Sequence, residues 1–270
     1  MTDFNRVRNY YQHFNEDNRL QNDASGRLEY EMTLALLKEH LPASGRVLDL
    51  GGATGAYSFP LAEAGYDVYL ADLSPALLKI AREKDTQNLL KGIDTVNATD
   101  LSLYPDGFFD AVMALGPFYH LTEETERQKA VREIFRVLKP GGKVLAAFIP
   151  HLSGSIAIVD RYLFAPFQVN GENLAEVFLT GKFNNAAAIG FQEGYYAESG
   201  EMENLFAQNG FEKIALRSIR GFAYEKEEAL LSIQDSRMKE IIFDLVRRTA
   251  GRKEIIETCG HAMYIGKKAD

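Results

Sequence analysis

The chain is short of cysteine, of positive charge and of long hydrophobic runs. Its 270 residues include one cysteine, Cys259, which excludes an internal disulfide and a structural zinc site built on several thiolates. Lysine and arginine number 30 against 38 aspartates and glutamates, so no broad positive field exists for nucleic acid or anionic lipid. No apolar run approaches the ~18 residues of a membrane span, and the first residues lack the layout of a secretion signal. These features predict a cytoplasmic protein that does not bind membranes.

The rest of the composition is that of a globular protein. Hydrophobic residues make up 46% of the chain, charged residues 25%, and there are 22 glycines. This is enough for one large domain or a domain with an insertion, and it excludes a disordered chain.

Strands and helices alternate over the first 150 residues. Short apolar runs bounded by turn residues predict strands at 46–50, 67–71, 95–98, 108–115 and 143–149. Helical spacing and capping residues predict helices at 56–64, 74–84 and 122–138. The alternation predicts an α/β fold with a doubly wound, Rossmann-like, mainly parallel sheet of about seven strands and helices on both faces.

The alternation stops after Pro150. Residues 151–197 mix helix-like stretches with glycine and asparagine, and no sheet strand is clear in them. Later elements are predicted as a helix at 201–208, a strand at 213–218, a helix at 229–248 and a strand at 262–266. The predicted organisation is an N-terminal lid and helix (1–44), a core (45–150), an inserted cap (151–197) and the C-terminal part of the core sheet (198–270).

The predicted cap is rich in aromatic residues. An insertion after the fifth strand lies beside the ligand crevice of such a sheet, so these side chains are expected to wall a hydrophobic pocket. Packing against the sheet edge is the alternative. The residues concerned are Tyr162, Phe164, Phe167, Phe183, Phe191, Tyr195 and Tyr196.

The glycine-rich turn at 51–55 predicts a nucleotide-like ligand, because backbone N–H groups at a helix start are accessible there. Asp72 lies 21 residues after Gly51 and ends the second strand, where a carboxylate can accept hydrogen bonds from a ribose diol. Asp49 precedes the turn, where it would repel a pyrophosphate but attract the ammonium and sulfonium of S-adenosylmethionine. These residues favour S-adenosylmethionine over NAD.

The segment Val47-Leu48-Asp49-Leu50-Gly51-Gly52-Ala53-Thr54-Gly55 resembles the first motif of the class I S-adenosylmethionine-dependent methyltransferases. The family pattern is acid-x-Gly-x-Gly-x-Gly, and Ala53 stands at its middle glycine. Ala98-Thr99-Asp100-Leu101 is similar to the third motif, which implies that Asp100 accepts a hydrogen bond from the adenine amino group. The resemblance covers about residues 45–150, and the cofactor-binding residues predicted on its basis are Tyr11, Arg19, Asp49, Gly51, Gly52, Ala53, Gly55, Asp72, Leu73, Thr99, Asp100, Leu101, Leu115 and Gly116.

The resemblance also implies that the N-terminal segment folds as a lid over the cofactor, with Tyr11 and Arg19 as candidate contacts. The Arg19 guanidinium could neutralise the cofactor carboxylate. The alternative is an exposed arginine beside Glu16 and Asp17.

The exit of the fourth strand, at residues 115–120, is expected to face the reacting methyl group. His120 is the candidate catalytic base, with a packing or capping role as its alternative. Tyr119 is expected to orient a substrate or to line the pocket. His151 could reach the same crevice, whereas His261 is expected to be structural.

The predicted function is S-adenosylmethionine-dependent methyl transfer to an oxygen or nitrogen of a small, partly apolar molecule, leaving S-adenosylhomocysteine. Leu115 and Gly116 replace the Asn- or Asp-Pro-Pro-aromatic motif typical of enzymes that methylate the amino group of a base, so a nucleic-acid partner is not expected. No metal is expected, and the protein is predicted to be a monomer or homodimer. Methylation of RNA or protein and a non-catalytic S-adenosylmethionine-binding module remain the alternatives.

Overall fold

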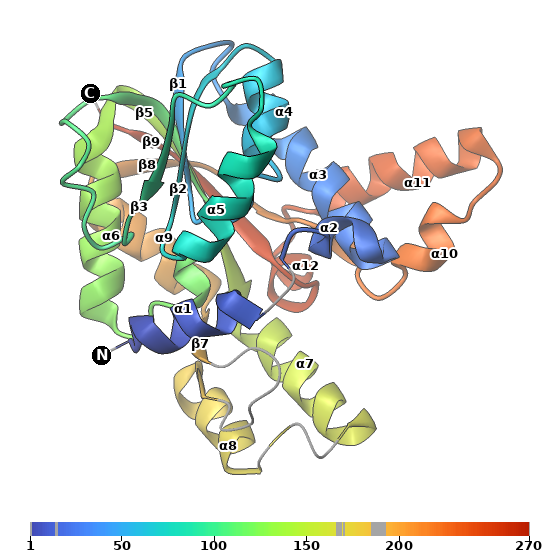
Figure 1. Cartoon of the computed structure of the whole chain (residues 1–270). Coiled ribbons are helices and arrows are strands. Elements are labelled where there is room, and N and C mark those ends of the chain that lie inside the picture. Colours follow the sequence, from blue (N-terminus) through green and yellow to red (C-terminus); the bar gives the residue numbers. More distant parts are fainter. Residues whose placement is uncertain (1, 14–15, 166–168, 170, 185–192, 270) are drawn as a thin grey trace.

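The computed structural model describes residues 2–13, 16–165, 169, 171–184 and 193–269, which form an α/β structure around a twisted sheet (Figure 1). Seven strands pair side by side in the order β3-β2-β1-β4-β5-β9-β8. All run parallel except β9, which is antiparallel to both of its neighbours. The mainly parallel sheet predicted from the sequence is therefore confirmed. The strands are β1 (Arg46–Leu50), β2 (Asp67–Asp72), β3 (Gly92–Thr95), β4 (Phe109–Ala114), β5 (Leu138–Pro150), β8 (Phe211–Ser218) and β9 (Ala262–Lys268).

Helices cover both faces of this sheet because successive strand residues point to opposite sides. In β1, Leu48 and Leu50 join one buried cluster and Val47 joins the other. The first cluster is covered by α6 (Glu124–Val137) and α9 (Ser199–Gln208). The second is covered by α3 (Ala24–His40), α4 (Ser58–Glu63), α5 (Pro75–Lys84) and α11 (Ser236–Thr249).

The insertion contains two strands, so the prediction that it lacks a sheet strand was wrong. It comprises α7 (His151–Phe164), α8 (Gly171–Thr180), β6 (Lys182–Asn184) and β7 (Glu193–Ala197). β7 pairs in parallel with the end of β5 and antiparallel with β6. The five residues of β7 include a glycine and two tyrosines, and their partner is the extension of β5 to Pro150. Neither feature produces a recognisable periodicity.

The helix predicted at 229–248 is divided into α10 (Glu227–Leu231) and α11. The Asp235 side chain accepts a hydrogen bond from the Met238 N–H at 3.0 Å, which caps the start of α11. A further short helix, α12 (Lys253–Thr258), precedes β9. None of the described helices is long and apolar enough to cross a membrane.

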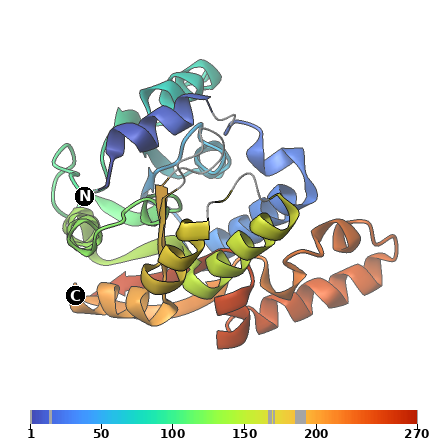
Figure 2. The same cartoon turned by 90° about the horizontal axis from the view of Figure 1, so that it is seen from below.

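The carboxyl ends of β1, β2, β4 and β5 share one edge of the sheet, and the N-terminal helix and the insertion lie at this edge. Figure 1 shows α1 (Phe4–His13), α7 and α8 below the sheet. Seen from that side, α1 and α7 lie on different sides of the space beneath the strands (Figure 2). The short α2 (Arg19–Asn22) joins α1 to α3. This edge therefore has walls formed by segments far apart in the sequence.

Candidate functional site

A cavity of about 350 Å³ lies at the carboxyl ends of the parallel strands. This is where ligands bind in open α/β sheets, and the volume lies within the range of small-molecule sites. Its walls include most of the residues predicted from the sequence, namely Tyr11, Arg19, Asp49, Gly51, Gly52, Ala53, Asp72, Leu73, Leu115, Gly116, Tyr119 and His120. Gly55, Thr99, Asp100 and Leu101 are not among the lining residues.

The turn after β1 bends tightly back over the sheet. The Gly51 N–H donates to the Ala71 carbonyl at 2.7 Å, and Gly51 and Gly55 have φ angles of 77° and 86°. Ala53 has a φ of 51°, the left-handed conformation that glycine adopts without strain. A Cβ atom on Gly52 would lie 2.5 Å from Asp49 Cγ, so a larger residue there would collide with that side chain.

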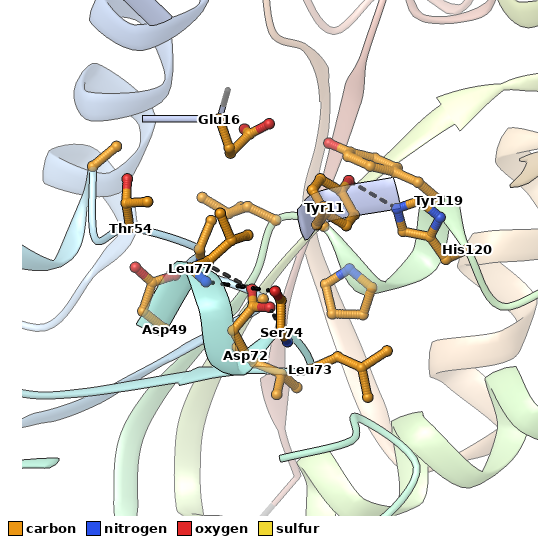
Figure 3. Close-up of a pocket in the computed structure, with 18 of the residues that line it drawn as sticks. Tyr11, Glu16, Asp49, Thr54, Asp72, Leu73, Ser74, Leu77, Tyr119 and His120 are labelled. Atoms are coloured by element: carbon orange, nitrogen blue, oxygen red, sulfur yellow. Dashed lines mark hydrogen bonds between the residues drawn. The ribbon is translucent and has the colours of Figure 1, made fainter. Parts of the chain in front are cut away.

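Asp49 points from β1 toward this turn and is only 1% exposed (Figure 3). Its Oδ2 accepts a hydrogen bond from the Ser58 hydroxyl at 2.7 Å. Its Oδ1 is enclosed and has no hydrogen-bond partner among the described residues. Burial raises the pKa of Asp49 to about 7, against the hydrogen bond from Ser58, and the charge of Asp72 raises it further. An enclosed carboxylate oxygen without a partner is suited to a cationic ligand group.

Asp72, at the end of β2, is 8% exposed and braces the turn. Its Oδ2 accepts from the Ala53 N–H at 2.9 Å and its Oδ1 accepts from the Ser74 N–H at 2.8 Å. Burial raises the pKa of Asp72 to about 6, although these hydrogen bonds lower it. Each carboxylate oxygen can accept a further hydrogen bond, so Asp72 can hold the turn and a ligand diol together.

The structure does not place the third-motif residues as expected. Asp100 is exposed, and its Oδ1 accepts from the Ser102 N–H at 3.1 Å. Hydrogen bonding to the Ser102 side chain, and then to its N–H, lowers the pKa of Asp100. The turn formed when the Asp100 N–H donates to the Asn97 carbonyl places Asp100 outside the cavity wall. Asn97 and Ala98 line the cavity instead. The adenine contact expected from Asp100, with Thr99 and Leu101, stays a prediction, and none of these three residues is among those that line the cavity.

Arg19 lies in the cavity wall with its charge already paired. Its Nε is 2.8 Å from Oε1 of Glu16, and its Nη1 is 3.0 Å from Oε1 of Glu29. Glu16 also lines the cavity, and burial raises its pKa despite the Arg19 charge. The expected contact with Glu16 is present, but the guanidinium is oriented by two carboxylates rather than left exposed.

His120 contacts Tyr11 of the N-terminal helix (Figure 3) and the Glu193 carbonyl of the inserted segment. Its Nδ1 lies 3.0 Å from the Glu193 carbonyl oxygen, which can only accept, so Nδ1 carries the proton. Its Nε2 then accepts from the Tyr11 hydroxyl at 2.9 Å. Burial lowers the pKa of His120 to about 4. Both ring nitrogens of His120 are therefore engaged by described residues, and its role as a base stays a prediction.

The described aromatic residues of the cap do not line the cavity. Tyr162 and Phe164 are 45% and 84% exposed. Phe183, Tyr195 and Tyr196 are buried in packed clusters, as the alternative of packing predicts. The other two members of the set, Phe167 and Phe191, lie outside the described residues.

Several cavity residues were not predicted from the sequence: Glu16, Tyr30, Tyr57, Asn97 and His261. Tyr30 of α3 and Tyr57 stack with ring centroids 5.5 Å apart, a contact between segments that no local pattern connects. Asn97 comes two residues after the end of β3, and this position at a strand end could have identified it as a cavity residue. Among the described residues, no cluster of three or more His, Cys, Asp or Glu side chains could hold a metal ion.

Comparisons with known proteins point to one family. A family described as "Methyltransferase domain" matches residues 48–146. The chain is 30% identical to a ubiquinone/menaquinone biosynthesis C-methyltransferase, UbiE, of Yersinia pestis bv. Antiqua over 184 residues, 65% of this chain and 70% of that protein. It is 36% identical to UbiE of Pectobacterium atrosepticum over 138 residues, 48% of this chain and 53% of that protein, about half the length of that relative.

A solved structure shows the same fold. The crystal structure of an S-adenosylmethionine-dependent methyltransferase from Methanosarcina mazei matches 87% of this chain and 97% of its own, with a TM-score of 0.60 and 18% identity. The matching relatives and the shared fold lead to one conclusion: the chain belongs to the class I S-adenosylmethionine-dependent methyltransferases, a family of enzymes whose cofactor is S-adenosylmethionine.

Proposed function

We propose that the protein transfers a methyl group from S-adenosylmethionine to a carbon atom of a small, partly apolar aromatic molecule. The observation that carries this proposal is a cavity whose wall is acidic in one part and apolar in another. One end has Asp49 and Asp72 around the glycine turn, and Leu115, Tyr119 and Ile149 provide apolar surface at the ends of β4 and β5. Such a cavity can bring a polar cofactor and an apolar acceptor into contact.

The carbon acceptor replaces the oxygen or nitrogen acceptor expected from the sequence. Its support is the printed name of the relatives, which are C-methyltransferases of ubiquinone and menaquinone biosynthesis. A ring carbon becomes nucleophilic when a neighbouring hydroxyl group loses its proton, so the proposed acceptor is a phenol or hydroquinone.

The residues of the turn fit the cofactor. The unpartnered Oδ1 of Asp49 would accept from its ammonium group, and Asp72 would accept from its ribose hydroxyls. Asn97 and Ala98 would flank the adenine. The bound cofactor supplies a methyl group on a positively charged sulfur, which makes that carbon an electrophile.

Calorimetric titration with S-adenosylmethionine, S-adenosylhomocysteine and NAD tests the cofactor site. We expect the first two to bind and NAD not to bind. Asp72→Ala should weaken binding by about 1–3 kcal/mol, because a hydrogen bond to a charged group is lost. Asp67→Ala, at the exposed start of the same strand, is the matched control. Binding of NAD alone would overturn the proposal.

Transfer is tested with S-adenosylmethionine carrying a ¹³C methyl group and 1,4-naphthohydroquinone under anaerobic conditions. We expect the label on a ring carbon, identified by NMR of the product. Label on oxygen would restore the acceptor expected from the sequence. Cofactor binding without transfer to any phenol, amine, RNA or protein would instead indicate a non-catalytic binding module.

A further inference from the structure

His261 lies at the cavity although it is distant in sequence from every motif. β9 runs antiparallel to β5, and Ala262 pairs with Phe148 near the carboxyl end of that strand. The residue just before β9 is therefore placed at the edge where the parallel strands end. His261 lines the cavity there, as does Ile149 of β5.

The two nitrogen atoms of the His261 ring have different surroundings. Nδ1 is enclosed and lies 3.2 Å from Oε2 of Glu29. Nε2 is not among the enclosed atoms, and no described residue forms a hydrogen bond with it. The Tyr119 ring stacks on the imidazole at a centroid distance of 5.1 Å and an interplanar angle of 18°, which holds the plane of the ring. Glu29 and Tyr119 together orient His261.

Glu29 is a fixed anion beneath this histidine. It is 7% exposed on α3, and burial by itself raises its pKa. The interaction with His261 and the charges of Arg19 and Arg220 outweigh burial and hold the pKa of Glu29 well below its usual range. Both terminal nitrogens of Arg19 donate to Oε1 at 3.0 Å, so Oε2 faces His261. A carboxylate held in this way favours the Nδ1–H tautomer, in which the lone pair is on Nε2.

We propose that His261, oriented by Glu29, is the base that removes the hydroxyl proton of the methyl acceptor. This inference rests on the proposed function and names the residue that activates its acceptor. His120, the candidate from the sequence, has both ring nitrogens engaged by Tyr11 and Glu193. In His261 one nitrogen faces a carboxylate and the other is available to a molecule in the cavity.

A hydroquinone acceptor reacts in two stages, methylation of a ring carbon and then loss of a proton from that carbon. His261 Nε2 takes the hydroxyl proton, and a ring carbon forms a bond to the methyl carbon. The bond between methyl and sulfur breaks with its electron pair on sulfur. The methylated ring carbon then loses its hydrogen as a proton and the ring hydroxyl is restored, so one proton is released for each methyl group transferred.

Other charged and titratable groups surround this histidine. Arg19 of α2 forms a hydrogen bond with Glu29, which in turn faces His261. Arg220 precedes the short helix at Gly221–Ala223 and forms an ion pair with Glu227 of α10 at 2.6 Å. Tyr119 is buried, which raises its pKa well above the ordinary value, so it remains neutral. Glu29 is thus the carboxylate within ion-pairing distance of His261.

The first experiment measures single-turnover methyl transfer to 1,4-naphthohydroquinone against pH, with cofactor affinity measured separately. His261→Gln should reduce the rate by about 10²–10⁴-fold near neutral pH, which is the usual contribution of a general base. The deficit should shrink as pH approaches the acceptor's own hydroxyl pKa, because the acceptor then ionises without help. A merely structural histidine would give a deficit that does not change with pH.

Two further variants complete this comparison. Glu29→Gln should lower the rate and change its pH profile while KM for the acceptor stays within about twofold, because Glu29 acts through His261. His40→Gln is the matched control, since His40 ends α3 and is not among the cavity residues. A normal rate and pH profile in His261→Gln would overturn the proposal.

The second experiment does not need methyl transfer. Diethylpyrocarbonate modifies accessible neutral imidazole nitrogens, and mass spectrometry identifies the labelled residue. We expect label on His261 and protection by 1,4-naphthohydroquinone bound with S-adenosylhomocysteine. If wild-type protein transfers no methyl group, the proposed function fails, while protected labelling of His261 still supports its contact with the acceptor. Absence of label, or label that the acceptor does not protect, would overturn the assignment.

Discussion

Ala53 keeps the backbone conformation of the family motif although the family has glycine at this position. It occupies the middle glycine position of the motif and keeps the positive φ, 51°, that a glycine would adopt. Its N–H still donates to Asp72 at 2.9 Å. The hydrogen bond therefore holds a conformation that costs an alanine about 1–2 kcal/mol.

Ala53→Gly should stabilise the protein, because glycine adopts this conformation without a Cβ clash. Part of the gain is offset by the greater freedom of glycine in the unfolded chain, so we expect about 0.5–1 kcal/mol in urea unfolding. Ala56→Gly, in the same segment, is a suitable comparison because no positive φ occurs there. If Ala53→Gly is less stable than wild type, the backbone of Ala53 is not strained.

Asp49 predicts a pH dependence of stability. Its pKa is about 7 in the folded protein and about 3.9 in an unfolded chain, so between these values the folded state binds more protons. The stabilising effect of the neutral form is present below pH 4 and is lost as pH rises to 7. The variant Asp49→Asn cannot ionise at this position, so it does not lose this stability as pH rises. The unfolding free energy of Asp49→Asn minus that of wild type should therefore increase by up to about 4 kcal/mol from about pH 4 to pH 7.

Thermal or urea unfolding of the unliganded protein at several pH values measures this difference, with Asp67→Asn as the exposed control. If the difference in unfolding free energy between Asp49→Asn and wild type does not change with pH, the prediction is wrong. The same ionisation should make S-adenosylmethionine bind more tightly as pH rises toward 7, since its ammonium group pairs with the charged carboxylate.

Among the elements, α1 is held over the cavity by contacts of Thr2, which precedes it, and of its own residues. The Thr122 N–H donates to the Thr2 hydroxyl at 2.9 Å, and the Thr2 N–H donates to Glu126 at 3.2 Å. Farther along, the Arg8 Nε donates to the Leu73 carbonyl at 3.3 Å, and Tyr11 reaches His120. These contacts attach α1 to the sheet edge, and its role as a lid over the cofactor stays a prediction.

Thr2→Val should loosen this attachment, because valine cannot accept the hydrogen bond from Thr122. If α1 is a lid, S-adenosylhomocysteine should dissociate several-fold faster, which stopped-flow displacement can measure. Thr249→Val is the control, since the Thr249 hydroxyl donates to the Leu245 and Val246 carbonyls within α11. An unchanged dissociation rate would mean that α1 does not control access to the cavity.

For the whole molecule, ligand binding at a preformed cavity predicts higher global stability. A ligand present at 100 times its Kd adds about 2.7 kcal/mol to the folded state. We expect S-adenosylhomocysteine to raise the melting temperature by about 5–10 °C under that condition, whereas NAD should not. Differential scanning fluorimetry measures both ligands in one experiment. An equal shift with NAD would contradict the preference inferred from Asp49.

Much of this organisation follows from the sequence alone. The strands of the core are short apolar runs, and their alternation with amphipathic helices is a local property that sequence periodicity reports. The glycine turn and its flanking acids are also local, because Asp49 precedes the turn by two residues and Asp72 ends the next strand. These features predicted the fold, the family and the cofactor.

Only the tertiary structure decided which side chains meet around the cavity. Glu29 and His261 come together because α3 packs on the sheet and β9 runs antiparallel to β5, and nothing within either segment encodes that contact. Asp100 is exposed in its own turn and does not line the cavity, and β7 pairs with β5 because β5 extends to Pro150. Local patterns specify strands, helices and turns, whereas distant side chains are brought together by packing and strand order.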